Sequence, residues 1–140
     1  MKEVFDKLKI KTIYNALEVK PGSATMLGSH GKSLIFAMPG PPPAVRLLFN
    51  ELIKPALLKI GGARTPLNRL VRAELTESIH IRPGNFLHLK GGVYFTEGGK
   101  LRVNLADRTE KINCVIHLPP GRRHLKNGEQ VAIHPTTADF

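Results

Sequence analysis

A proline-rich corner constrains the fold of this chain more than any other stretch. It reads Pro39-Gly40-Pro41-Pro42-Pro43, and it joins a short apolar run at residues 33–37 to a long segment with regularly spaced apolar residues. Proline holds φ at about −65° and lacks a backbone N–H, so a strand cannot continue through this corner. In the first turn of a helix, however, the missing donor costs nothing. The corner therefore predicts a strand, a stiff turn and a helix that begins at Pro42 or Pro43.

The segment after the corner has the most regular helical pattern in the sequence. Its apolar residues recur every three or four positions, as on one face of an amphipathic helix. They are Val45, Leu48, Phe49, Leu52, Ile53, Ala56, Leu57 and Ile60. Pro55 lies inside this pattern and predicts a kink, because it removes one helical hydrogen bond. Gly61-Gly62 predicts the end of the helix near Ile60.

Three short strands are expected before the corner, at residues 13–19, 25–27 and 33–37. Lys20-Pro21-Gly22-Ser23 predicts a turn after the first of them, since proline presets φ and glycine tolerates a positive φ. Residues 3–9 have helical spacing over barely two turns, which is marginal for an isolated helix. We expect them to be the end of a helix that begins upstream of this chain.

The pattern changes after Gly62. Residues 63–66 have the composition of a linker, and beyond them short apolar runs are separated by Gly, Pro and Asn. Such spacing indicates a small all-β barrel or sandwich. We therefore expect an α/β domain at residues 1–62 and an all-β domain at residues 63–140. The first has too few elements to cover both faces of a mixed sheet, so we expect it to be truncated at its N-terminus or completed by another chain.

Composition and charge narrow the function only broadly. An apolar fraction of 41% and a charged fraction of 23% are typical of a soluble globular protein, and no apolar run is long enough for a membrane span or a signal peptide. The single cysteine, Cys114, agrees with a reducing compartment, so a cytoplasmic location is expected. The net charge of +10 favours anionic partners in general.

The clearest chemical signal is the corner itself. The carboxyl end of a strand followed by a helix N-terminus is a common place for anionic ligands in α/β folds. The alternative is that the corner only turns a strand into a helix. The six histidines show no metal-ligand spacing, and no metal site is predicted; His80, His88 and His117 are expected on the barrel surface. The sequence contains no P-loop and no GxGxxG motif.

Several motifs in a fixed order resemble the C-terminal portion of molybdopterin molybdotransferase, the MoeA type that is related to the E domain of gephyrin. They are Val19-Lys20-Pro21-Gly22, the Phe36–Pro42 corner, the helix with Leu52-Ile53-Lys54-Pro55, and the tail Leu125-Lys126-Asn127-Gly128. The resemblance extends over essentially all 140 residues, but only over the latter third or so of a full-length member of the family.

The resemblance implies a partial three-layer α/β molybdopterin-binding subdomain followed by a small C-terminal β-barrel. It implies a transferase that inserts molybdate into adenylylated molybdopterin with Mg²⁺, in molybdenum cofactor biosynthesis, as a cytoplasmic homodimer. It assigns the cofactor-binding wall to seven positions: Lys20, Pro21, Gly22, Ser23, Pro39, Gly40 and Pro42. Lys20 would supply a positive charge and Gly40 a backbone N–H, while Pro39 and Pro42 would hold the loop rigid.

This sequence departs from the family pattern in two places. The family reads Lys-Pro-Gly-Lys-Pro where this chain has Ser23-Ala24 after the glycine, and Pro-Gly-Asn-Pro where it has Pro41. The glycine-rich loop and the metal-binding carboxylates of the family should precede Met1, so the chain holds no assigned catalytic residue or Mg²⁺ ligand. We do not expect it to be active alone, and the choice between molybdate and tungstate stays open, as do the dimer contacts.

A different class of function remains compatible with the sequence. A basic, non-catalytic binding or scaffolding module would take a nucleotide, a nucleic acid or an acidic protein as its partner. No aromatic ladder interleaves the basic residues, which makes nucleic acid the weaker choice.

Overall fold

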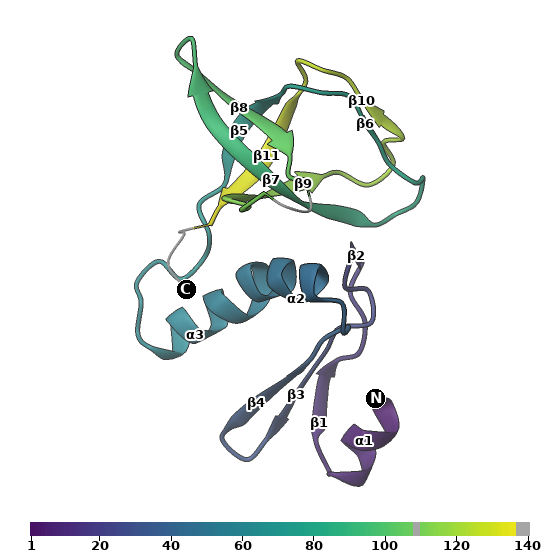
Figure 1. Ribbon diagram of the computed structural model, residues 1–140. Coiled ribbons are helices and arrows are strands. Elements are labelled where there is room, and N and C mark those ends of the chain that lie inside the picture. The colour runs from purple at the N-terminus through teal and green to yellow at the C-terminus, as the bar shows by residue number, and fades with distance from the viewer. Residues whose placement is uncertain (108–109, 137–140) are drawn as a thin grey trace.

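The computed structural model of this chain describes residues 1–107 and 110–136, and Figure 1 shows their arrangement. A small antiparallel sheet with a short helix lies at one end, and a β-barrel lies at the other. A long helical segment runs between them.

The small sheet has the strand order β1-β3-β4 and is antiparallel throughout. Its elements are α1 (Lys2–Lys7), β1 (Lys11–Tyr14), β3 (Met26–His30) and β4 (Ser33–Ala37). Phe5, Ile10 and Met26 form its buried core, against which Ile35 and Ala37 pack. The strands near residues 25–27 and 33–37 are confirmed. The three-layer arrangement expected from the resemblance stays a prediction.

The strand expected at residues 13–19 is wrong, because the structure divides it. β1 ends at Tyr14, and β2 (Val19–Lys20) belongs to a different sheet, where it pairs in parallel with β7 (Leu87–Glu97). Between them, the Leu17 N–H donates to the Ser23 carbonyl at 3.0 Å and closes a loop. The alternating apolar pattern extends across both strands, so the pattern alone does not show the break.

The long helix is confirmed and contains a π-helical turn. It consists of α2 (Pro42–Leu48), η1 (Phe49–Ile53) and α3 (Lys54–Ile60), and it ends before Gly61-Gly62 as predicted. Pro55 cannot donate to the Glu51 carbonyl, and its ring crowds that oxygen. The widened turn just before it accommodates both effects, as π-bulges commonly do.

The expected apolar face of this helix is buried over only part of its length. Leu47 and Leu48 are buried, whereas Leu57 and Ile60 are 54% and 70% exposed. The helix therefore packs on the barrel through α2 and η1, whereas α3 extends beyond the barrel (Figure 1).

The barrel predicted for the second half is confirmed as a closed ring of five strands. In order around the ring they are β7, β8 (Lys100–Leu105), β5 (Val71–Leu75), β11 (Gln130–Pro135) and β9 (Cys114–Leu118), and β9 returns to β7. A two-stranded ribbon of β6 (Ile79–His80) and β10 (His124–Leu125) lies beside it. The buried core is aliphatic and includes Leu75, Val103, Ile116, Leu118 and Ile133.

Gly92 lies where β7 pairs with two strands at once. It pairs with Leu105 of β8 and with Cys114 of β9, at the point where the strand bends around the ring. A Cβ atom there would lie 2.6 Å from the Ile116 Cδ1 and 3.0 Å from the Asn104 carbonyl oxygen, so a side chain at this position would overlap its neighbours.

Residues 1–62 and residues 63–140 contribute to one common sheet and to one common buried cluster. β2 extends the barrel sheet through β7, and Leu47 of α2 joins Leu89 and Val115 of the barrel in one buried cluster. The division at residues 62 and 63 stays a prediction.

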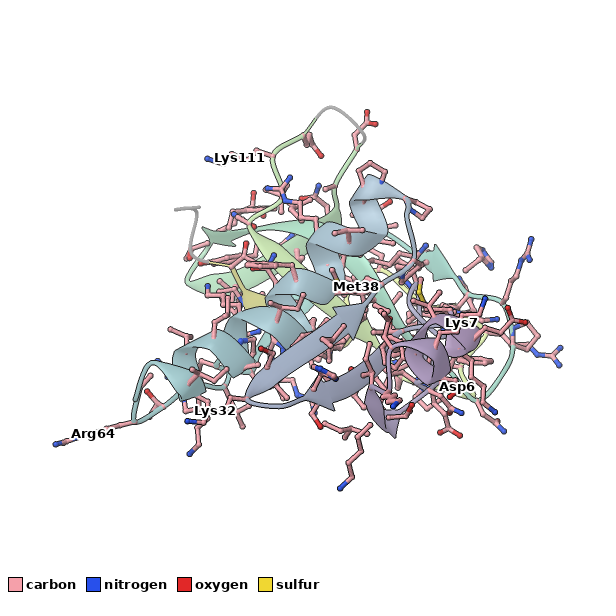
Figure 2. The ribbon with its side chains drawn as sticks, turned by 90° about the horizontal axis from the view of Figure 1, so that it is seen from below. Asp6, Lys7, Lys32, Met38, Arg64 and Lys111 are labelled. Carbon is pink, nitrogen blue, oxygen red and sulfur yellow. The ribbon has the colours of Figure 1, made fainter. Side chains whose placement is uncertain are left out.

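Lys32, Arg64 and Lys111 come from separate segments and point away from the body of the molecule (Figure 2). Within residues 1–107 and 110–136, the helices lack the length and apolar character that a membrane span requires.

Candidate functional site

The predicted turn at Lys20–Ser23 is tightly built against the long helix. Gly22 is buried, has a φ of +118°, and leaves no room for a side chain: a Cβ would lie 2.5 Å from the Leu48 Cδ2. The Lys20–Pro21 peptide bond is cis, and the Gly22 carbonyl accepts from the Thr25 N–H at 2.9 Å. The Lys20 Nζ lies 4.2 Å from the centre of the Phe86 ring, a cation–π contact.

The corner at Pro39–Pro43 is open to solvent at its tip. Gly40, Pro41 and Pro42 are exposed, and Pro41 caps the helix in an extended conformation. Pro42 is the first helical residue, as predicted. The Val45 N–H donates to the Pro41 carbonyl at 3.1 Å. Pro42 and Pro43 have no N–H. In the described first turn of this helix, the Ala44 N–H is therefore the one backbone donor that lacks a helical acceptor.

An apolar pocket of about 240 Å³ lies between the helix, the loop before β2 and the barrel. Leu48 connects it to the predicted turn, since this side chain contacts Gly22 and also lines the pocket. The remaining lining comes from Leu17, Glu18, Val19, Glu51, Leu52, Leu87, Leu89 and His117. Its polar groups are few, and Glu51 and His117 contact each other.

Glu51 and two histidines form a compact cluster beside this pocket. The Glu51 Oε2 lies 3.0 Å from the His117 Nε2 and 2.8 Å from the His134 Nδ1. The two imidazoles meet edge to face with their ring centres 4.3 Å apart. Glu51 comes from the π-helical turn, and the histidines come from the neighbouring barrel strands β9 and β11.

The electrostatics of the cluster favour a charged carboxylate. Burial by itself raises the pKa of Glu51, but the hydrogen bonds and the charges of His117 and His134 outweigh it. The result is a pKa below the usual value for glutamate. Glu51 is therefore ionised at neutral pH although its side chain is only 10% exposed.

The prediction that His117 lies on the barrel surface needs correction. It does point outward from the barrel, but the helix covers that face, and the side chain is only 15% exposed. Strand alternation places Val115 and His117 on this face, together with Ala132 and His134 of β11. The alternation of side chains along each strand can be read from the sequence, and it places each histidine on the outer face. Only the pairing of β9 with β11 brings the two histidines together.

Cys114 is buried in the barrel and is predicted to be unreactive. Burial raises the pKa of its thiol from 9.0 to about 12, so the thiolate fraction at pH 8 falls about 1,000-fold. We expect a disulfide reagent at pH 8 to modify the native chain at least 1,000-fold more slowly than the chain in denaturant. Equal rates in the two conditions would contradict the buried position.

Comparisons with known proteins agree with the fold. The chain is 26% identical over 144 residues to a molybdopterin molybdenumtransferase of Staphylococcus aureus, a match that covers 98% of this chain and 34% of the relative. The corresponding protein of Staphylococcus epidermidis is 24% identical, with 94% and 33% covered. The chain thus spans about a third of the length of these curated relatives. No protein-family model matches it.

Solved structures show the same arrangement. A molybdopterin biosynthesis MoeA protein from Pyrococcus horikoshii has a TM-score of 0.75 at 18% identity, covering 96% of this chain and 34% of that one. A molybdenum cofactor biosynthesis protein from Pyrococcus furiosus has a TM-score of 0.71 at 20% identity, covering 91% and 46%. The resemblance indicated by the sequence motifs is thereby confirmed.

Proposed function

We propose that this chain, which resembles molybdopterin molybdenumtransferases along nearly all of its length and a third of theirs, acts in molybdenum cofactor biosynthesis. In finer detail, it would serve as the C-terminal portion of a transferase that inserts molybdate into adenylylated molybdopterin. The observation that carries the proposal is the 98% coverage of this chain by relatives with that name. The buried turn and the helix that follows the corner support it.

Within this proposal the predicted residues supply one wall of a binding site for anions. Lys20 provides a positive charge, and the Phe86 ring beside it restricts where the ammonium group lies. Gly40 and Ala44 provide backbone N–H groups at a corner that proline keeps rigid. Pro21 and Gly22 fix the turn, and Ser23 offers a hydroxyl at its end.

The described residues do not fit the Mg²⁺ that the family resemblance implies. Mg²⁺ takes oxygen ligands in octahedral geometry. In residues 1–107 and 110–136, the one group of three or more potential ligands is Glu51, His117 and His134, which offers two nitrogens and one carboxylate. No step is therefore assigned to Mg²⁺ in this chain.

A homodimer and a cytoplasmic location are part of the proposed role in molybdenum cofactor biosynthesis.

Binding of molybdopterin to the purified chain tests this function. We expect saturable binding, and we expect Lys20→Ala to weaken it about 10-fold, because it removes one charge-assisted hydrogen bond. Equilibrium ultrafiltration with quantified pterin gives both dissociation constants. Lys32→Ala is the matched control, since Lys32 is an exposed lysine in the turn between β3 and β4.

Two results would count against the proposal in different ways. Equal affinity of wild type and Lys20→Ala would remove Lys20 from the site. No saturable pterin binding, together with DNA or RNA binding that falls steeply with salt, would favour the basic binding module instead.

A further inference from the structure

We propose that Glu51, His117 and His134 form a binding site for a divalent transition-metal ion, with Zn²⁺ as the best match. Two imidazole nitrogens and one carboxylate make up a ligand set that Zn²⁺ commonly uses when one coordination position stays open. The inference concerns a site separate from the Lys20 turn and the corner, and it does not depend on the proposed function.

The three ligand atoms are already gathered. The Glu51 Oε2, His117 Nε2 and His134 Nδ1 all lie within 4.8 Å of one another, and the oxygen is 2.8–3.0 Å from each nitrogen. Ligands at about 2.0–2.1 Å from a tetrahedral Zn²⁺ lie about 3.4 Å apart. A tetrahedral ion therefore requires the oxygen and each nitrogen to move apart by roughly half an ångström.

The burial of Glu51 is the second observation that points to a ligand. Its side chain is nine-tenths buried, and its Oε1 has no hydrogen-bond partner among the described residues. A buried carboxylate group with an oxygen that lacks a hydrogen-bond partner is costly. A metal ion would offset that cost, because it can bind Oε2 alone or both carboxylate oxygens.

The elements that hold the ligands are regular secondary structure, and a pocket lies beside them. His117 and His134 stand on adjacent, hydrogen-bonded strands, and Glu51 stands on the π-helical turn just before Pro55. The apolar pocket reaches Glu51 and His117, so it gives an ion an entry path and leaves room for a water or another small ligand. Each imidazole would turn a lone pair toward the ion and keep its proton on the other ring nitrogen.

The donor set also selects the ion. Mg²⁺ and Ca²⁺ prefer oxygen ligands, whereas imidazole suits Zn²⁺, Cu²⁺, Ni²⁺ and Fe²⁺. We therefore expect Zn²⁺ to bind with one ion per chain and Mg²⁺ not to compete for the site.

The test is Zn²⁺ binding to the full chain after treatment with a chelator, measured by competition with a chromogenic indicator. We expect Glu51→Gln and His134→Gln each to weaken binding by at least about 100-fold, because loss of an outer partner alone costs 10–100-fold. Zn²⁺ should also raise the melting temperature of the wild type and of neither variant. Circular dichroism of each variant shows whether the fold is intact.

Control variants separate this site from other histidines. His30→Gln changes an exposed histidine of β3 and should leave Zn²⁺ binding unchanged. His80 and His124 stack at the β6–β10 ribbon and are the competing pair. Binding that survives Glu51→Gln and His134→Gln but is lost in His80→Gln would overturn the proposal, as would the absence of binding to the wild type.

Discussion

Replacing Ile133 by alanine is expected to lower the free energy of unfolding by about 2–5 kcal/mol. Ile133 is fully buried in the barrel core, on the strand that pairs with both β5 and β9. Truncation removes apolar contacts and leaves a cavity that a closed ring of strands cannot easily collapse. Urea unfolding should show a lower midpoint with an unchanged slope.

Two further variants calibrate this expectation. Ile133→Val should cost about 0.5–1.5 kcal/mol, because it removes a single methyl group. Ile60→Ala changes an isoleucine that is 70% exposed and should stay within about 0.5 kcal/mol of the wild type. A cost for Ile133→Ala no larger than that for Ile60→Ala would contradict the closed barrel core.

Replacing Gly22 by alanine is expected to destabilise the chain by about 2–5 kcal/mol, through two separate effects. Alanine is strained at a φ of +118°, at about 1–2 kcal/mol. Its Cβ would also overlap the Leu48 Cδ2 at 2.5 Å, and Leu48 is fully buried and cannot move aside cheaply. Such overpacking adds about 1–3 kcal/mol. Equilibrium unfolding in urea measures the sum.

A double-mutant cycle divides the two effects. In a Leu48→Ala background the overlap disappears, so Gly22→Ala should cost only the backbone strain, about 1–2 kcal/mol. Gly31→Ala is the control, since Gly31 has a φ of +57° and open space around it. An equal cost for Gly22→Ala in both backgrounds would show that the turn does not rest on Leu48.

Local patterns in the sequence predicted the elements whose causes are local. The proline run forced a strand to end and a helix to start at Pro42, and Gly61-Gly62 ended that helix near Ile60. The order of the motifs along the chain indicated the resemblance to the C-terminal portion of molybdopterin molybdotransferase. The barrel followed from short apolar runs with turn residues between them.

Long-range pairing could not be predicted in the same way. Val19 and Tyr14 belong to one alternating run, yet they pair in different sheets. Strand pairing joins residues far apart in sequence, and no local propensity specifies the partner. His117 was expected on an exposed surface for a related reason, since the helix that covers it packs there through contacts between residues far apart in sequence.

The sequence by itself determined where the chain must turn, which segment forms the long helix, and which residues are apolar enough to fill a barrel. Backbone sterics and hydrophobic periodicity act over a few residues, so their effects can be predicted from the sequence alone. Only the tertiary structure placed Glu51 between His117 and His134, since these positions lie 66 and 83 residues apart and meet solely through the packing of η1 on β9 and β11.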